Sequence, residues 1–214
     1  TFPLQNRNKI DVLIKEFLEK LGDDIHDMLC DNNELAEADT YNGLDSDRDT
    51  EEEVETAIRF FPEVLTRIIV DDDEDGIFRY PIQQLAITHD EYGGWQCNVK
   101  TVLFIPIVAR LAVEFDLFEE DERGGLLSIH DQSCNVLLQL MACDPIHVHH
   151  QEHHESVDTK YLQVLIRLRQ LDLLKKEDIQ SYDLLHRLCR EDHDYITKKR
   201  YKMLVEWDPN ALTQ

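Results

Sequence analysis

The sequence predicts an all-α fold, a short solenoid of stacked helix pairs preceded by an N-terminal amphipathic helix. Three observations predict it. Apolar residues recur every three or four positions through most of the chain, which is the spacing of a helix face. No segment shows the sustained alternation of a half-buried strand. Two distant apolar segments repeat one another, and stacked repeats bury a core that one helix pair cannot bury alone.

The composition is that of a globular protein. Of the 214 residues, 42% are hydrophobic and 31% are charged, so the chain is far from the compositions that remain disordered. A chain of this length forms one sizeable domain or a short solenoid and can bury a substantial core.

Residues 1–30 are expected to form an N-terminal helical unit. Nine apolar positions predict an amphipathic helix over residues 8–29; they are Ile10, Leu13, Ile14, Phe17, Leu18, Leu21, Ile25, Met28 and Leu29. Residues 31–49 follow as a polar, acidic segment that contains the turn-forming pair Asn42-Gly43. We interpret residues 31–49 as a flexible acidic linker.

Residues 50–214 are expected to form the helical repeat domain. It opens at Thr50, which together with Glu53 matches a capping box. Pro62 interrupts the first helix, and Pro81 occupies the first position of a short helix. A turn is expected at residues 71–76, a break at 123–125 and a histidine-rich loop at 147–155. Further helices are expected over residues 98–118, 135–142, 158–174, 176–189 and 197–207.

Self-similarity is the strongest signal in the sequence. Residues 104–111 and 161–168 carry apolar side chains and an arginine at matching positions. The segments after them match as well, Phe115-Asp116-Leu117-Phe118 against Leu171-Asp172-Leu173-Leu174. A shorter apolar pattern is also repeated: Ile82, Leu85 and Ala86 return as Leu137, Leu140 and Met141. We therefore expect repeated units, each with a short and a long helix.

The region of the first short helix resembles the ankyrin repeat. The acidic turn Asp73-Glu74-Asp75-Gly76 precedes Tyr80-Pro81-Ile82-Gln83-Gln84-Leu85-Ala86, which is similar to the ankyrin pattern Thr-Pro-Leu-His-x-Ala. The resemblance covers about residues 58–214 and is to degenerate, ankyrin-like repeats such as those of diatom repeat proteins. It implies a helical stack that binds proteins and performs no catalysis. The long segments are 57 residues apart, from 104 to 161, against about 33 in ankyrin repeats, so insertions must account for the excess.

The charge balance favours a basic protein partner. With 45 acidic and 22 basic residues, the formal net charge is −23, which repels phosphate backbones and argues against nucleic acid. The expected partner-binding residues are those of the acidic turn and two aromatic anchors: Asp71, Asp72, Asp73, Glu74, Tyr92 and Trp95. The alternative is that the acidity serves solubility alone. Residues 158–206 differ, because eleven basic residues there nearly balance nine acidic ones.

A histidine cluster is the candidate metal site. On a helix, His149 and His153 would share one face, as would His150 and His154, and imidazoles at this spacing bind zinc, nickel or copper. The alternative is a solvated loop with adventitious affinity for divalent metal. We expect no resident cofactor, and metal retained through purification would favour a metal-associated protein instead.

The sequence carries no motif of a known catalytic site, and we expect no enzyme activity. It lacks both the Gly-x-Ser-x-Gly and the phosphate-binding glycine patterns. The loop that begins at Asp71 resembles the start of an EF-hand, but Ile82 occupies the twelfth position, where calcium binding needs a glutamate. A structural subunit of a larger assembly, with the N-terminal helix docking in trans, is the remaining alternative.

Cysteine usage favours an intracellular, reducing compartment, either the cytoplasm or an organelle interior. The chain has five cysteines without a Cys-x-x-Cys pair, which is typical of buried free thiols. No apolar run is long enough to span a bilayer, and no signal peptide is visible. Because the sequence starts at Thr1, a processed N-terminus and a fragment of a longer repeat array both stay open.

Overall fold

The computed structural model describes residues 4–31, 42–70, 78–89, 95–129, 134–144, 151–189 and 197–213. It is mostly helical, and the expected all-α class is confirmed. The helices are α1 (Leu4–Cys30), α2 (Glu51–Phe60), α3 (Pro81–Gln84), α4 (Ile105–Glu114), α5 (Val136–Gln139), α6 (Gln151–Gln170), α7 (Lys176–Ser181), α8 (Leu184–Leu188) and α9 (Lys198–Trp207). Short 3-10 turns are η1 (Pro62–Thr66), η2 (Val102–Phe104), η3 (Glu120–Glu122) and η4 (Pro209–Thr213).

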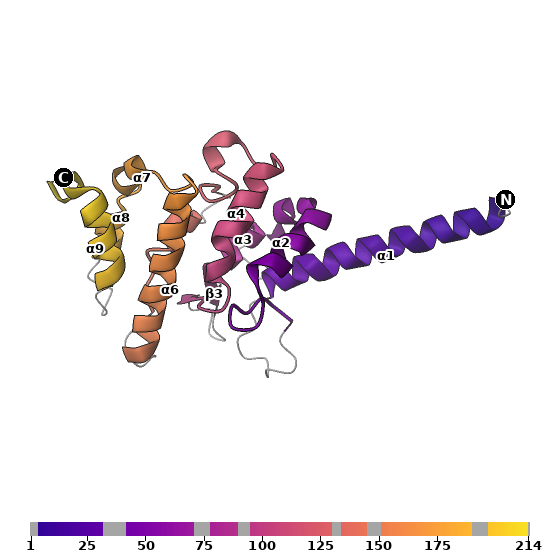
Figure 1. Ribbon diagram of the computed structural model, residues 1–214, viewed down its shortest axis with the longest axis horizontal. Coiled ribbons are helices and arrows are strands. Elements are labelled where there is room, and N and C mark those ends of the chain that lie inside the picture. The colour runs from indigo at the N-terminus through magenta and orange to yellow at the C-terminus, as the bar shows by residue number, and fades with distance from the viewer. Residues whose placement is uncertain are drawn as a thin grey trace.

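The helices lie in two rows. The longer helices α2, α4, α6 and α9 stand side by side across the molecule (Figure 1), and each contacts the next. The short helices α3, α5 and α8 form the second row, in which α3 contacts α5 and α5 contacts α8. Helix α1 packs against α3 and η1 with its C-terminal part and then projects away from the body. Within each row, the order of the helices in space therefore follows their order along the chain.

The core lies between the two rows. Helix α4 carries the apolar segment Ile105–Glu114, and most of its side chains are buried. The repeated apolar residues of the short helices are also buried; these are Ile82, Leu85, Ala86, Leu137, Leu140 and Met141. A short helix cannot be stable alone, so its packing against the longer row supplies its stability.

The two helix ends that the sequence analysis matched share one backbone geometry. Asp116 and Asp172 follow α4 and α6 with φ of 54° and 59°, in the left-handed region. The next amides return to the helix: Leu117 N–H donates to the Ala112 carbonyl at 3.0 Å, and Leu173 N–H donates to the Leu168 carbonyl at 2.9 Å. This is the bonding of a Schellman C-cap. The end of α9, at Asp208, has a different geometry, because the φ of Asp208 is −130°.

The expectation of no strands is wrong. Two antiparallel ladders occur among the described residues. Strand β1 (Ile69–Val70) pairs with β2 (Phe78–Arg79), and β3 (Ile87–His89) pairs with β4 (Trp95–Cys97). Strands of two or three residues are too short to produce a visible alternation. Their apolar residues therefore gave no strand signal.

Several helix boundaries also differ from the expected ones. The apolar segment 98–118 is helical only as η2 and α4, because the Asn98 side chain accepts the Lys100 and Thr101 amides at 3.2 Å and holds a turn. Helix α6 begins at Gln151, so residues 151–155 are helix and not loop. The segment 176–189 divides into α7 and α8 at Asp183, whose φ is 52°.

The expected linker is partly packed. Leu44 is fully buried, its amide donates to the Met28 carbonyl at 3.2 Å, and the Ser46 amide donates to the Lys100 carbonyl at 2.8 Å. Residues 42–49 are therefore held against the body, and the linker prediction is wrong for them. Residues 32–41 lie outside the described chain. The capping box at Thr50 is confirmed, since its side chain and that of Glu53 bond each other's amides.

Candidate functional site

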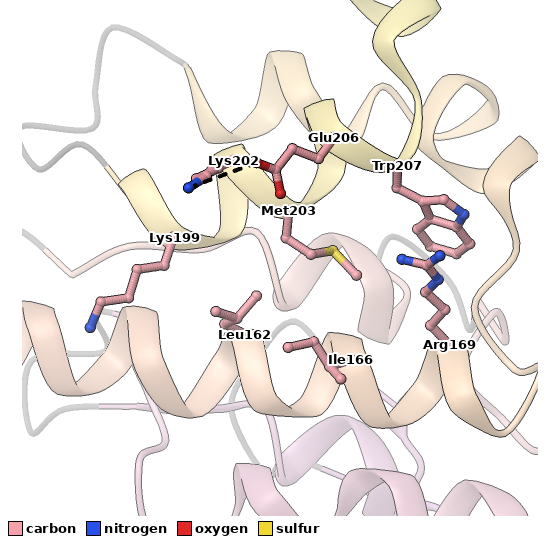
Figure 2. Close-up of a pocket in the computed structure, with 8 residues that line it drawn as sticks. All are labelled: Leu162, Ile166, Arg169, Lys199, Lys202, Met203, Glu206 and Trp207. Carbon is pink, nitrogen blue, oxygen red and sulfur yellow. Dashed lines mark ion pairs between the residues drawn. The ribbon is translucent and has the colours of Figure 1, made fainter.

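An open groove of about 630 Å³ lies between α6 and α9, and we call it the α6–α9 groove (Figure 2). Its apolar lining comprises Leu162, Ile166, Met203 and Trp207. Its charged lining comprises Arg169, Lys199, Lys202 and Glu206. An open groove that combines apolar and charged side chains is typical of a peptide- or protein-binding surface.

Helical spacing places these side chains on facing surfaces. Leu162 and Ile166 are four residues apart on α6, one turn from each other. On α9 the same spacing aligns Lys199, Met203 and Trp207 along one line. The two lines face each other across the groove (Figure 2). The packing of α6 against α9 therefore creates the groove.

One end of the groove is closed by an aromatic contact. The Arg169 guanidinium lies 4.4 Å from the centre of the Trp207 ring, within the range of a cation–π interaction. This contact fixes the orientation of the guanidinium and of the half-buried indole together. At a protein interface, an aromatic residue and an arginine that are already ordered bind with a smaller loss of conformational entropy.

The groove is locally positive in an acidic protein. It contains three cations and one carboxylate, whereas the chain carries a net charge of −23. Lys202 pairs with Glu206 at 3.7 Å, an exposed contact between neighbouring turns that is worth little. The Lys199 ammonium donates to the Thr159 hydroxyl at 2.6 Å. Carboxylates of a partner are the groups best suited to this rim.

A buried ion pair fixes α9 relative to α6. Arg200 and Asp158 are both buried, and the Arg200 Nε atom lies 3.1 Å from Asp158 Oδ1. The other Asp158 oxygen accepts the Lys199 amide at 2.9 Å, at the start of α9. The guanidinium also donates to the carbonyls of Leu140 and Ala142, at 2.6 and 3.0 Å. These bonds connect α9, α6 and the end of α5, so the groove has a rigid base.

A second buried cluster lies at the start of α6. Asp144 accepts the Cys97 amide at 2.6 Å and pairs with His153 Nε2 at 2.7 Å. Burial is the largest single influence and opposes ionisation, but the bonds from His153 and Cys97 together outweigh it, so the pKa of the Asp144 carboxyl is lowered. Burial raises the pKa values of the Cys97 and Cys143 thiols. Both are therefore neutral thiols at pH 7 and not activated nucleophiles.

The structure tests few of the residues selected from the sequence. Trp95 lies in β4 opposite His89, and nothing is described of its side chain. The other expected partner-binding residues, Asp71, Asp72, Asp73, Glu74 and Tyr92, lie outside the described chain.

The expected metal ligands divide in the same way. His149 and His150 lie outside the described residues, so neither predicted face of the cluster can be traced in full. His153 and His154 occupy the first turn of α6, where His153 bonds Asp144 and His154 is buried. In the described ranges no three metal-binding side chains gather into one site. The expectation of a solvated loop is thus wrong for His153 and His154.

None of the residues that line the α6–α9 groove was predicted as a site residue from the sequence. The only sequence signal for them is the near-neutral composition of residues 158–206, set against an acidic chain. That signal points to a region of the sequence but not to a surface of the protein, because it does not specify which faces of α6 and α9 meet. The prediction of buried thiols is also wrong for Cys134 and Cys189, which are exposed in the structure.

Comparisons of the chain with family models, curated proteins and solved structures find no match. Within the described part of the chain, every helix is too short or too polar to cross a membrane.

Proposed function

We propose that the protein is a non-enzymatic scaffold that binds a partner protein in the α6–α9 groove. The observation that carries the proposal is the combination of an apolar floor with a cationic rim in a chain of net charge −23. Electrostatic complementarity steers association and selects the partner, while apolar burial supplies most of the affinity. The partner that fits is an acidic amphipathic segment.

The proposed mode of binding follows from the lining of the groove. Apolar side chains of the partner cover Leu162, Ile166 and Met203, and its carboxylates reach Lys199 and Lys202. An amphipathic helix presents these two kinds of side chain on adjacent faces, and its apolar face lies in the groove, as in other helix-in-groove complexes. The stacked Arg169–Trp207 pair forms one edge of the site, where a carboxylate can accept from the guanidinium without disturbing the stack.

The same proposal includes an ankyrin-like solenoid architecture. It is supported by the two rows of contacting helices and by the matching C-caps at Asp116 and Asp172. Stacked helix pairs of this kind present extended surfaces along each row. In this arrangement the α6–α9 groove belongs to the row of longer helices, while the acidic turn at residues 71–74 would provide a separate surface for a basic partner.

A peptide-display selection on the full chain tests the proposal. A random peptide library is selected on the immobilised protein, and enriched peptides are measured by fluorescence anisotropy. We expect enrichment of peptides with Asp or Glu beside apolar residues. Replacing Lys199→Glu and Lys202→Glu together should weaken their binding by about tenfold or more, because each exposed charge pair contributes about 0.2–1 kcal/mol and reversal adds repulsion.

The matched control reverses two charges on the same helices outside the groove. Arg167 on α6 and Lys198 on α9 are exposed and do not line it, so Arg167→Glu with Lys198→Glu should leave the affinity unchanged. Equal loss in both double variants would indicate a general charge effect and overturn the proposed site. Enrichment of basic peptides that bind all variants equally would move the binding surface to the acidic turn.

A further inference from the structure

The N-terminal half of α1 presents an apolar stripe that the body does not cover. Ile10, Leu13, Ile14, Phe17 and Leu18 are between 44% and 65% exposed. They lie on one face by helical spacing, in the part of α1 that projects from the body (Figure 1). Helices in proteins draw most of their stability from the packing of an amphipathic face. A contiguous exposed apolar stripe marks an interaction surface.

The stripe continues into a second groove, the α1–α2 groove, of about 830 Å³. Its apolar lining comes from Leu18, Leu21 and Ile25 of α1, from Ala57 and Phe60 of α2, and from Phe61, which follows α2. Phe60 is 75% exposed. Glu52 and Glu53 form an acidic rim at the start of α2. Groove and stripe together run along α1 from Ile10 to Ile25, which at about 1.5 Å per residue is about 23 Å.

We infer that this surface binds a second copy of the same chain, with the two α1 helices antiparallel and the N-terminal half of each in the α1–α2 groove of the other. The first argument is charge. Residues 4–20 contain four basic and three acidic residues, a net charge of +1, so the rest of the chain carries −24. The incoming helix is therefore the one segment of α1 suited to the acidic rim at Glu52 and Glu53.

The second argument is the order of charges along one edge of α1. Lys9, Glu16, Lys20 and Asp27 are spaced at seven, four and seven residues, which places them along one line of the helix, and all four are exposed. In an antiparallel pair centred near Leu18, Lys9 lies opposite Asp27 of the other copy and Glu16 lies opposite Lys20. A parallel pair would place like charges together, which is unfavourable.

The same register matches the apolar positions. With the axis of the antiparallel pair between Phe17 and Leu18, within one residue of the register of the charges, Ile14 lies against Leu21 of the other copy and Ile10 against Ile25. The incoming helix also reaches Phe60 at the edge of the groove. The stripe and the groove are thus complementary in both shape and charge.

The first measurement is the molar mass of the full chain by light scattering during gel filtration. We expect twice the 25.2 kDa of the single chain. Phe17→Asp, in the centre of the stripe, should give the single-chain mass. Val12→Asp is the matched control, because Val12 is exposed on the opposite face of α1 and should leave the dimer intact. A single-chain mass for the unaltered protein overturns the inference.

Cross-linking tests the antiparallel register. The two exposed thiols are first removed by Cys134→Ser and Cys189→Ser. In that background Leu18→Cys, next to the symmetry axis, should form a disulfide-linked dimer on oxidation, while Ile10→Cys and Val12→Cys should not. Equal cross-linking through Ile10→Cys would indicate parallel helices and overturn the assignment. Peptide binding in the α6–α9 groove should be unchanged in Phe17→Asp, which separates this test from that of the proposed function.

Discussion

At the scale of single residues, Asp144 shows how a buried carboxylate depends on its partners. Its pKa is lowered in the folded chain, because the bonds from His153 and the Cys97 amide together outweigh burial. A lowered pKa means that the folded state favours the charged form. The stabilisation is therefore present above the unfolded pKa, about 3.9 for aspartate, and is lost as the pH falls through the lower folded value.

This predicts a pH-dependent loss of stability in Asp144→Asn. At pH 7 the free energy of unfolding of the variant should be lower by about 1.5 kcal/mol, the low end for a hydrogen bond to a charged group. The low end applies because asparagine can still accept a hydrogen bond from the Cys97 amide. The difference from the unaltered protein should shrink as the pH falls below about 4. Urea denaturation between pH 7 and pH 3 measures it. The control Asp121→Asn, at an exposed site, should show neither effect. A stability difference for Asp144→Asn that does not change with pH would contradict the role given to the Asp144 charge.

Single-residue features were predictable where the chemistry is local. The Thr50 capping box was found because its two partners are three residues apart. The contact between Arg169 and Trp207 joins helices that are separated by two intervening segments. Sequence spacing contains no information about such a contact, since it depends on how α6 and α9 are packed. For the same reason the residues of the α6–α9 groove could not be selected in advance.

At the scale of elements, the C-caps at Asp116 and Asp172 allow a direct test of the repeat. Both residues have left-handed backbones and exposed side chains, a conformation that costs an L-residue about 1–2 kcal/mol and costs glycine nothing. Asp116→Gly and Asp172→Gly should each raise the free energy of unfolding, by up to about 1 kcal/mol after the greater unfolded-state freedom of glycine is subtracted. Denaturant titration should give similar values for the two variants.

Asp208 supplies the contrast. It also follows a long helix, but its φ is −130° and its buried carboxylate accepts from Gln180 and pairs with Lys176. Asp208→Gly should therefore destabilise the protein, since it removes these bonds and relieves no strain. Opposite signs for Asp116→Gly and Asp172→Gly would show that the two ends are not equivalent.

The helices could be predicted as helices from the sequence, but their first and last residues could be predicted less well. Proline and glycine marked the start of α3 and the break after η3 correctly, because their backbone limits act locally. The start of α6 was placed seven residues too late, since the histidines between Gln151 and Asp158 gave no apolar spacing. In the structure His154 and Val157 are buried, so tertiary packing extends the helix beyond its apolar pattern.

At the scale of the whole molecule, the stack has two different ends. Helix α1 covers one end through Ile25 and Leu29, which are buried, and α9 with η4 covers the other. Several of the main contacts join helices that are not consecutive in the chain, namely α1 with α3, α2 with α4 and α6 with α9. Although residues 4–20 and 158–206 are nearly neutral, the excess of 23 acidic groups over basic ones acts on the folded chain as a whole.

This excess predicts that salt stabilises the protein near pH 7. Raising NaCl from 0.01 to 0.1 M shortens the screening length from about 30 to about 10 Å. That weakens repulsion among the acidic groups but also weakens the pairs Arg59–Glu114 and Arg110–Glu55, which join α2 to α4. These pairs lie at the surface and are partly exposed, where an ion pair is individually weak, so the relief of repulsion should dominate.

The expected result is a higher Tm in the higher salt, by about 2–4 °C for each kcal/mol of repulsion removed in a chain of this size. Calorimetry at one fixed protein concentration measures it. The control is the same pair of salt concentrations near pH 4.6, the sequence pI. There the net repulsion is absent and only attractive pairs remain to be screened, so the Tm should stay constant or fall. A Tm that falls with salt at pH 7 would show instead that the ion pairs between helices outweigh the excess negative charge.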